Sequence, residues 1–214
     1  LTLNVGEKYV YSPKASSPLD IYYQWYQNGE DMSTDPSFTF NAERPSRSKV
    51  ILELSNDLGK VTLENKVTVR GADYSKGCFI INEGWYGHGS GSISYYNYDN
   101  NSIEHWCYKN QNFGDELGVT SQSGTLWNGK LYVCSKQNNQ LVIVDPKTLY
   151  AEKSIGLLLP SGRQAYEFIP VNDQYAVVTA NGDFYRIDLN TFEAIRISTG
   201  STWGGCGSGI VYQD

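Results

Sequence analysis

A strand pattern that stops at an aspartate and restarts after a short turn occurs three times between residues 77 and 197 of this chain. In "QLVIVDPKTLYAEKSI" (140–155), an alternating apolar run ends at Asp145, a turn follows, and a second short apolar run begins. The same pattern surrounds Asp99 and Asp188, so the three aspartates are 46 and 43 residues apart. A period of about 40 to 50 residues that contains only strands is typical of a β-propeller, in which each repeat forms one four-stranded blade.

The three aspartates are predicted to shape turns. A carboxylate at the end of a strand can accept hydrogen bonds from main-chain amides of the following turn, and Pro146 fixes φ in one of these turns. We therefore expect Asp99, Asp145 and Asp188 to be structural residues rather than catalytic ones.

The repeats predict a partial propeller over residues 77–214. They lie near residues 77–106, 122–155 and 164–197, which amounts to about three blades. The first repeat begins with "GCFIIN", which aligns with the second strand of the later repeats, so its innermost strand has no counterpart nearby. Because a propeller typically needs at least about four blades to close, we expect the protein to continue beyond Asp214.

Residues 1–70 form a separate compositional unit, and residues 71–76 are predicted to be a hinge. "YYQWYQNGE" (22–30) alternates and ends in Asn-Gly, a strong signal for a tight turn, and three more strand candidates follow it. This spacing predicts a small β-sandwich with Trp25 in its core. The expected fold class is therefore all-β throughout.

Composition and charge exclude several classes of function. The formal net charge is −6 and no Lys/Arg cluster is present, which argues against a nucleic-acid partner. No apolar run approaches the roughly 18 residues that a transmembrane helix needs. The sequence starts at Leu1 rather than Met, which leaves room for a leader or lipid anchor upstream.

The four cysteines, Cys78, Cys107, Cys134 and Cys206, contain no Cys-x-x-Cys pair, so we expect no structural zinc site. Cys78 and Cys134 lie in apolar strand-like runs, where cysteine usually behaves as a small buried hydrophobe. We expect free thiols, and a disulfide is the alternative.

Both parts of the chain resemble known families. "LYVCSKQNNQLVIVDPKTLYAEKSI" (131–155) resembles the YVTN-type β-propeller repeat, and "CFIINEGWYGHGSGSISYYNYDNNSIE" (78–104) is similar to the first blade of a subgroup found on the surface of Gram-negative gut anaerobes. "LNVGE", "YQWYQNGE" and "SNDLGKVT" resemble PKD or immunoglobulin-like modules. The propeller resemblance implies an exported protein at the cell surface, outer membrane or periplasm, often a lipoprotein. Some members of that group cap outer-membrane transporters and bind corrinoids of the vitamin B12 type.

Loops at one end of the predicted blades supply the candidate ligand-binding residues. Propellers bind ligands on the loops that enter the innermost strands and on those that join the middle strands. Aromatic rings, amides and one Arg there suit a neutral or anionic planar ligand or a sugar, through stacking and directional hydrogen bonds. Repeat alignment matches Gln122 with Gln164, 42 residues apart. For any single residue the alternative role is packing between blades. The candidates are Glu83, Trp85, Tyr86, His88, Gln122, Arg163, Gln164, Tyr166 and Trp203.

Catalysis is the competing function. A glycosidase needs two carboxylates on either side of the bond it cleaves, and Glu83, Asp115 and Glu116 are candidates without a recognisable motif. His88 and His105 lack a third ligand at metal spacing. We therefore expect no catalytic residue, metal or cofactor.

The sequence thus predicts an exported binding protein whose propeller captures a small nutrient for outer-membrane uptake. The resemblance makes a corrinoid the specific expectation. The alternative is a structural, protein-interaction or glycan-binding surface module with no role in uptake.

Overall fold

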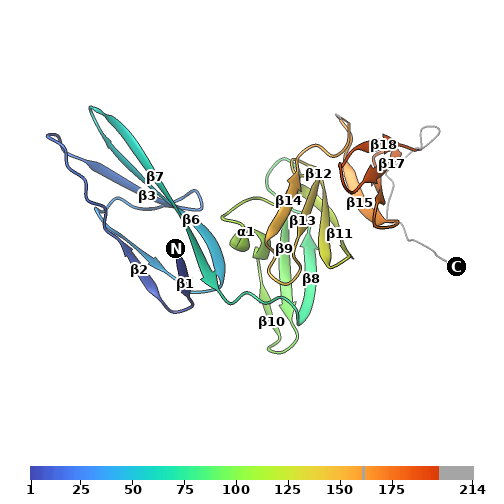
Figure 1. Ribbon diagram of the computed structural model, residues 1–214, viewed down its shortest axis with the longest axis horizontal. Coiled ribbons are helices and arrows are strands. Elements are labelled where there is room, and N and C mark those ends of the chain that lie inside the picture. Colours follow the sequence, from blue (N-terminus) through green and yellow to red (C-terminus); the bar gives the residue numbers. More distant parts are fainter. Residues whose placement is uncertain (161, 198–214) are drawn as a thin grey trace. The chain divides into compact units, whose positions relative to one another are not determined.

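The chain forms two compact units in a computed structural model that describes residues 1–160 and 162–197. The N-terminal unit contains Leu1–Asp73 with Lys109–Asp115, and the C-terminal unit contains Tyr74–Tyr108 with Glu116–Asp214. The described residues form eighteen strands and one short helix (Figure 1). The all-β prediction is confirmed.

The N-terminal unit contains seven strands in two sheets. Five strands form one sheet in the order β1-β7-β6-β3-β4, and β2 pairs with β5 in the second sheet. The strands are β1 (Thr2–Asn4), β2 (Lys8–Tyr11), β3 (Tyr22–Gln27), β4 (Glu30–Ser33), β5 (Phe38–Asn41), β6 (Ser46–Asn56) and β7 (Gly59–Arg70).

Trp25 lies in the core of this unit, as predicted. Only 2% of its surface is exposed, its ring lies 5.5 Å from that of Phe38, and its indole N–H donates to the main-chain oxygen of Asp35 at 2.9 Å. A buried indole needs such a partner for its polar atom. The other core residues are Leu3, Phe38, Phe40, Ala42, Val50, Leu52, Val67 and Val69.

Residues 109–115 pack with the N-terminal unit, although they lie far along the chain from its strands. Gln111 Nε2 donates to the main-chain oxygen of Pro45 at 2.8 Å, and the Phe113 amide donates to that of Arg47 at 2.9 Å. The Arg47 guanidinium carbon lies 4.2 Å from the Phe113 ring centroid. The repeat pattern predicts this segment to be part of the propeller, whereas these contacts place it with the N-terminal unit. The limits of the domains at residues 71–76 stay a prediction.

The described residues of the C-terminal unit form three antiparallel sheets in chain order. Each sheet pairs consecutive strands, and the described residues form no closed sheet. The first has β8 (Gly77–Asn82), β9 (Ser92–Asn97) and β10 (Ser102–Glu104); the second has β11 (Val119–Trp127), β12 (Lys130–Gln137), β13 (Leu141–Val144) and β14 (Ala151–Ile155); the third has β15 (Ala165–Pro170), β16 (Tyr175–Ala180), β17 (Asp183–Asp188) and β18 (Ala194–Arg196). Helix α1 (Cys107–Gln111) follows the first sheet.

Pairing registers show which strands are equivalent. Strand β8 pairs with β9 through Cys78↔Tyr96, β12 with β13 through Leu131↔Val144, and β16 with β17 through Ala176↔Ile187. In each pair the second residue directly precedes the residue that begins the turn after the third strand. Strand β8 therefore corresponds to β12 and β16, the second strands of the other sheets. Among the described residues, the first sheet has three strands and no counterpart of β11 or β15.

Asp145 and Asp188 shape the turns that follow the third strands. One carboxylate oxygen of each accepts bonds from the amides two and three residues later, at 2.7 and 3.2 Å for Asp145 and at 2.8 and 3.2 Å for Asp188. Their main-chain oxygens accept a further bond from the amides of Leu149 and Phe192, both at 2.7 Å. The predicted structural role of these two aspartates is confirmed.

The prediction for Asp99 is wrong in register. Asn97 occupies the equivalent position, and its side-chain oxygen accepts a bond from the Asp99 amide at 2.8 Å. Asp99 itself forms an exposed ion pair with Lys76 at 3.2 Å. An Asn side-chain carbonyl accepts the same bonds as a carboxylate, so an alignment on aspartates missed this substitution.

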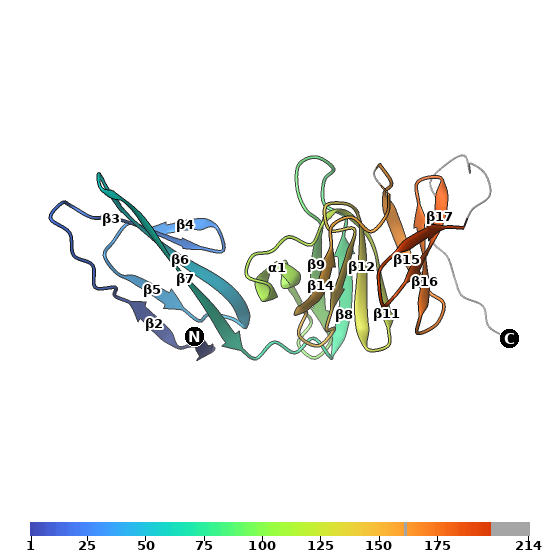
Figure 2. The same cartoon turned by 45° about the horizontal axis from the view of Figure 1, so that its top comes forward.

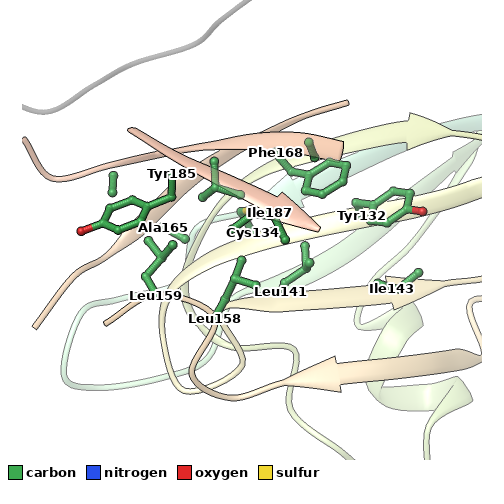
Figure 3. Packing of buried hydrophobic residues seen from close by; sticks show 13 residues of the cluster. Tyr132, Cys134, Leu141, Ile143, Leu158, Leu159, Ala165, Phe168, Tyr185 and Ile187 are labelled. Carbon is green, nitrogen blue, oxygen red and sulfur yellow. The ribbon is translucent and has the colours of Figure 1, made fainter. Parts of the chain in front are cut away.

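A buried apolar cluster joins the second and third sheets (Figure 3). Within it the rings of Tyr132 and Phe168 stack, with centroids 4.3 Å apart and planes within 3° of parallel. The buried Gln140 side chain anchors the connecting segment, because its oxygen accepts bonds from the amides of Leu158 and Leu159 at 3.0 and 2.9 Å.

The described part of the chain has no helix with the length and apolarity that a membrane crossing requires. Cys78, Cys107 and Cys134 are free thiols, as expected. Cys206 lies outside the described residues.

Candidate functional site

One end of the three sheets in the C-terminal unit gathers the loops that carry the candidate residues. Because consecutive strands are antiparallel, the connections between second and third strands (83–91, 138–140 and 181–182) lie at the same end as the segments that enter β11 and β15. Figure 2 shows the β8–β9 loop projecting at this end, which we name the loop end. The turns of Asp145 and Asp188 lie at the other end.

A polar cluster at the loop end combines side chains from all three sheets. Gln122 Nε2 donates to Glu83 Oε1 at 2.9 Å, and Lys136 Nζ lies 3.6 Å from the same oxygen. Lys136 Nζ also lies 5.0 Å from the centroid of the Tyr166 ring. We name Glu83, Gln122, Lys136 and Tyr166 the Glu83 cluster.

Two β-bulges position this cluster. Pairing between β11 and β12 skips Gln122, and pairing between β15 and β16 skips Tyr166, so each is the extra residue of a bulge. A bulge leaves a residue outside the ladder and redirects its side chain. The two residues thus occupy equivalent positions 44 residues apart.

The predicted match of Gln122 with Gln164 is therefore wrong by two residues. Gln164 precedes β15, and its main-chain amide donates to the Asn181 side-chain oxygen at 2.8 Å. Aligning the two repeats on their apolar strands does not show at which residue each bulge falls.

Strain in the main chain accompanies the first bulge. Thr120 has a φ of +59° although it is β-branched, and only 3% of its surface is exposed. Its main-chain oxygen lies 3.3 Å from Gln122 Nε2. Such a conformation costs about 1 to 3 kcal/mol and persists only where the surroundings enforce it. The surroundings here also direct Gln122 toward Glu83.

The β8–β9 loop is fixed at its base and exposes aromatic rings at its tip. The Ser90 hydroxyl accepts from the Gly118 amide at 3.1 Å and donates to the Gly118 carbonyl at 2.8 Å. At the tip, the rings of Trp85 and His88 lie 4.1 Å apart and are tilted by 30°, and 70% of Trp85 is exposed. Tyr86, 55% exposed, accepts a bond from Gln137 Nε2 at 3.0 Å.

Arg163 is engaged inside the third sheet. Its guanidinium lies 2.8 Å from Asp183 Oδ2 and donates to the main-chain oxygen of Asn181 at 2.9 Å. Arg196 lies 2.5 Å from the other Asp183 oxygen, and only 1% of the Asp183 side chain is exposed. Because a buried carboxylate requires compensation, these two arginines hold Asp183 in place.

The predicted residues therefore divide into three groups. Glu83, Gln122 and Tyr166 lie in the cluster, and Trp85, Tyr86 and His88 form the adjacent loop tip. Arg163 and Gln164 hold the third sheet together through the contacts above. Trp203 lies outside the described residues.

Sequence reasoning missed Lys136 and Gln137. Both follow the buried core of β12, at the point where the strand reaches the loop end. In "VCSKQ" two long polar side chains follow the apolar part of a strand, which is the only sign of them in the sequence. Their partners, Glu83 and Tyr86, come from the loop of the neighbouring sheet and cannot be identified from this strand alone.

The side chains at the loop end combine hydrogen-bonding groups with exposed aromatic rings. The Glu83 carboxylate is bound by an amide and an ammonium group. The described residues contain no group of three or more His, Cys, Asp or Glu that could hold a metal. Exposed rings beside directional donors and an acceptor are the usual elements of a small-molecule site.

Fold and site together define a class, an all-β protein of repeated antiparallel sheets with a polar and aromatic surface at one end. Residues 76–214 match the family described as "Domain of unknown function (DUF5074)", and the chain belongs to this family.

Comparison with solved structures supports a propeller-like fold. A crystal structure of a quinonprotein alcohol dehydrogenase-like protein from Bacteroides thetaiotaomicron VPI-5482 is similar, with 28% identity and a TM-score of 0.67. The similarity covers 91% of this chain and 45% of that one, so the chain spans about half the length of the solved protein. No curated protein sequence matches the chain.

Proposed function

We propose that this chain is the ligand-binding part of an exported cell-surface protein that captures a small nutrient for uptake through an outer-membrane transporter. In this proposal the C-terminal unit is part of a YVTN-type propeller, and the N-terminal unit is a PKD or immunoglobulin-like spacer. The observation that carries it is the pair of bulges that direct Gln122 and Tyr166 into one cluster with Glu83 and Lys136.

The chemistry of the loop end indicates the class of ligand. An indole that is 70% exposed offers a flat apolar surface, which favours a ligand with a planar ring system. The Gln122 amide, the Lys136 ammonium and the Glu83 carboxylate offer donors and an acceptor for polar substituents. A corrinoid combines a flat macrocycle with amide side chains, and it is the specific candidate that the family resemblance supplies.

Calorimetry with cyanocobalamin tests the corrinoid proposal. We expect heat of binding at micromolar concentrations, with Trp85→Ala and Gln122→Ala each weakening affinity about tenfold. Tyr98→Ala is the matched control, since Tyr98 is an exposed aromatic residue at the opposite end of the first sheet. Absence of heat removes the corrinoid, and equal losses from all three variants contradict binding at the loop end.

Glycan binding by the N-terminal unit is the second candidate function. A cavity of about 540 Å³ on this unit is lined by Tyr22, Tyr23, Gln24 and Pro36 among others, and 67% of Tyr22 is exposed. Tyrosine rings and polar side chains of this kind stack on sugars and bond to their hydroxyls. A glycan array separates the two functions, because this one predicts signals that Tyr22→Ala abolishes and Trp85→Ala leaves unchanged.

A further inference from the structure

One edge of strand β7 is open along most of its length. Strand β6 pairs with β7 from Asn56↔Gly59 to Ser46↔Val69, whereas β1 covers the opposite edge only at Thr68–Arg70. Within the described residues of the N-terminal unit, no strand covers that edge from Gly59 to Val67. The β6–β7 hairpin extends beyond the two-stranded sheet of β2 and β5 (Figure 1 and Figure 2).

The open segment is exposed on both faces. All eight residues from 59 to 66 are exposed, including Val61 at 56% and Leu63 at 45%. An open edge that also exposes apolar side chains is able to pair with another strand, and native proteins usually cover or shorten it.

The main-chain groups on this edge belong to the even-numbered residues. The Leu1 amine donates to the Lys66 carbonyl at 3.0 Å, and the Thr68 amide donates to the Leu1 carbonyl at 2.9 Å. Because ladder groups alternate in direction along a strand, the N–H and C=O groups of Lys60, Thr62 and Glu64 point the same way. No described residue bonds to these groups.

We propose that a second copy of this chain pairs with β7 in antiparallel orientation, centred on Thr62. This register sets Thr62 opposite Thr62, Lys60 opposite Glu64 and Val61 opposite Leu63. Each residue whose N–H and C=O groups point to the open edge then lies opposite another such residue of the second copy. The three pairs formed by Lys60, Thr62 and Glu64 give about six main-chain hydrogen bonds between the copies. A twofold axis repeats the ion pair and the apolar pair on both sides of the centre.

Charge selects this register over its neighbours. Centring on Leu63 sets Lys60 opposite Lys66, and like charges directly opposite each other destabilise a sheet. Centring on Val61 sets Glu64 opposite Leu58 and leaves both charges without a partner across the interface. Only the Thr62 register among these three pairs opposite charges.

Ion pairs within each copy continue across the proposed interface. Lys60 Nζ lies 2.7 Å from a Glu53 oxygen, and Glu64 lies 4.0 Å from Lys49. Pairing in the Thr62 register joins these into one row of alternating sign, which crosses both sheets. Such complementarity favours a second copy over a strand of unrelated sequence.

Sedimentation velocity over concentrations of about 5 to 500 µM tests the pairing in a range suited to weak association. We expect a reversible dimer. Thr62→Pro removes only a donor that faces the open edge, and edge strands tolerate proline, so we expect association at least about tenfold weaker. Thr62→Val, which keeps the N–H, is the matched control and should dimerise.

A charge exchange tests the register itself. In the Thr62 register, Lys60→Glu alone sets two glutamates opposite each other on both sides of the twofold axis, and Glu64→Lys alone sets two lysines opposite each other. We therefore expect each variant to associate at least about tenfold more weakly. An equimolar mixture pairs opposite charges again and should regain the dimer. Circular dichroism melts confirm that each variant is folded.

Three outcomes would overturn the proposal. They are a chain that stays monomeric over the whole range, a dimer that Thr62→Pro leaves intact, and a mixture that associates no better than its separate components. A longer form in which residues before Leu1 extend β1 along this edge, and which is monomeric where this chain dimerises, would identify the chain's own extension as the occupant instead.

Discussion

Asp145 and Asp188 each hold a turn between a third and a fourth strand through two side-chain acceptor bonds. We expect Asp145→Ala and Asp188→Ala each to lower the free energy of unfolding by about 1 kcal/mol, since the turn amides lose their acceptors. Asp99→Ala is the control and should change it by less than about 0.5 kcal/mol, because an exposed ion pair contributes little. Urea denaturation measures all three, and a loss for Asp99→Ala equal to the other two would contradict the register.

Asp183 is buried between Arg163 and Arg196, and the two arginines compensate one carboxylate. Replacing either arginine with Met leaves the other in place, so we expect a loss of about 1 to 2 kcal/mol. Replacing both leaves the carboxylate without its two cations, so the loss should exceed the sum of the single losses by about 1 kcal/mol or more. A double-mutant cycle in urea measures this, and additive losses would show that Asp183 does not depend on the pair.

Burial controls the reactivity of two thiols. It raises the pKa of Cys134 to about 12, with Glu167 adding to the shift, and it raises the pKa of Cys107 to about 12, with Glu104 adding to it. Because the thiolate is the reactive form, both should alkylate far more slowly at pH 8 than the partly exposed Cys78. Mass spectrometry after timed iodoacetamide treatment measures each site, and equal rates for Cys78 and Cys134 in the folded protein would contradict this.

Residue roles that depend on local sequence were predictable, and those that depend on partners from other strands were not. Trp25 and Asp145 follow from an alternating strand and a turn signal that are visible in a few neighbouring residues. The ion pair of Arg163 with Asp183 and the contact of Lys136 with Glu83 require knowledge of which strands adjoin. Arg163 was therefore predicted as a ligand residue while Lys136 was missed.

The bulges in β11 and β15 show the same limit at the scale of elements. Periodicity identified the strands, but a single extra residue in a strand leaves no mark in an alternating pattern. Because of the bulges, Gln122 and Tyr166 occupy equivalent positions in their sheets. The sequence therefore located the correct segment at the start of β15, but it matched Gln122 with Gln164 instead of Tyr166.

The close approach of the β8–β9 loop to β11 depends on a glycine. A Cβ on Gly91 would lie 2.2 Å from Ser121 Oγ and 2.8 Å from the main-chain oxygen of Asn82. We expect Gly91→Ala to cost about 2 kcal/mol, because the added Cβ would also lie 2.6 Å from Ser121 Cβ, so that relief requires a shift of β11 or of the β8 main chain at Asn82. The control is Gly89→Ala in the same loop, where a Cβ would meet nothing within 4 Å, so the change should stay within about 0.5 kcal/mol. Thermal denaturation compares the two, and similar melting temperatures would contradict the close approach.

For the whole molecule, the sequence predicted the repeated sheets but not which segments of the chain make up each of the two units. The aspartate period located the three sheets of the C-terminal unit, because each repeat forms one sheet from consecutive strands. The assignment of residues 109–115 to the N-terminal unit has no local signal, since it depends on side chains that meet only after both segments fold.

Phe113 tests whether this remote segment stabilises the N-terminal unit. Its ring lies 4.2 Å from the Arg47 guanidinium carbon and 5.4 Å from Lys66 Nζ, at the ends of β6 and β7 that adjoin the core. Phe113→Ala removes both contacts between cation and ring, each worth about 0.5 to 1 kcal/mol where partly exposed. We expect faster hydrogen exchange in peptides covering β6 and β7, with β15 to β18 unchanged.

Phe192→Ala is the matched control for this experiment, because Lys153 Nζ lies 4.0 Å from the Phe192 ring within the C-terminal unit. It removes the same kind of contact, and it should increase exchange around β14 and β18 while leaving β6 and β7 unchanged. Local openings are confined to cooperative units, so the two variants should affect separate sets of peptides. If Phe113→Ala increased exchange only in the C-terminal unit, residues 109–115 would stabilise that unit rather than the strands they contact.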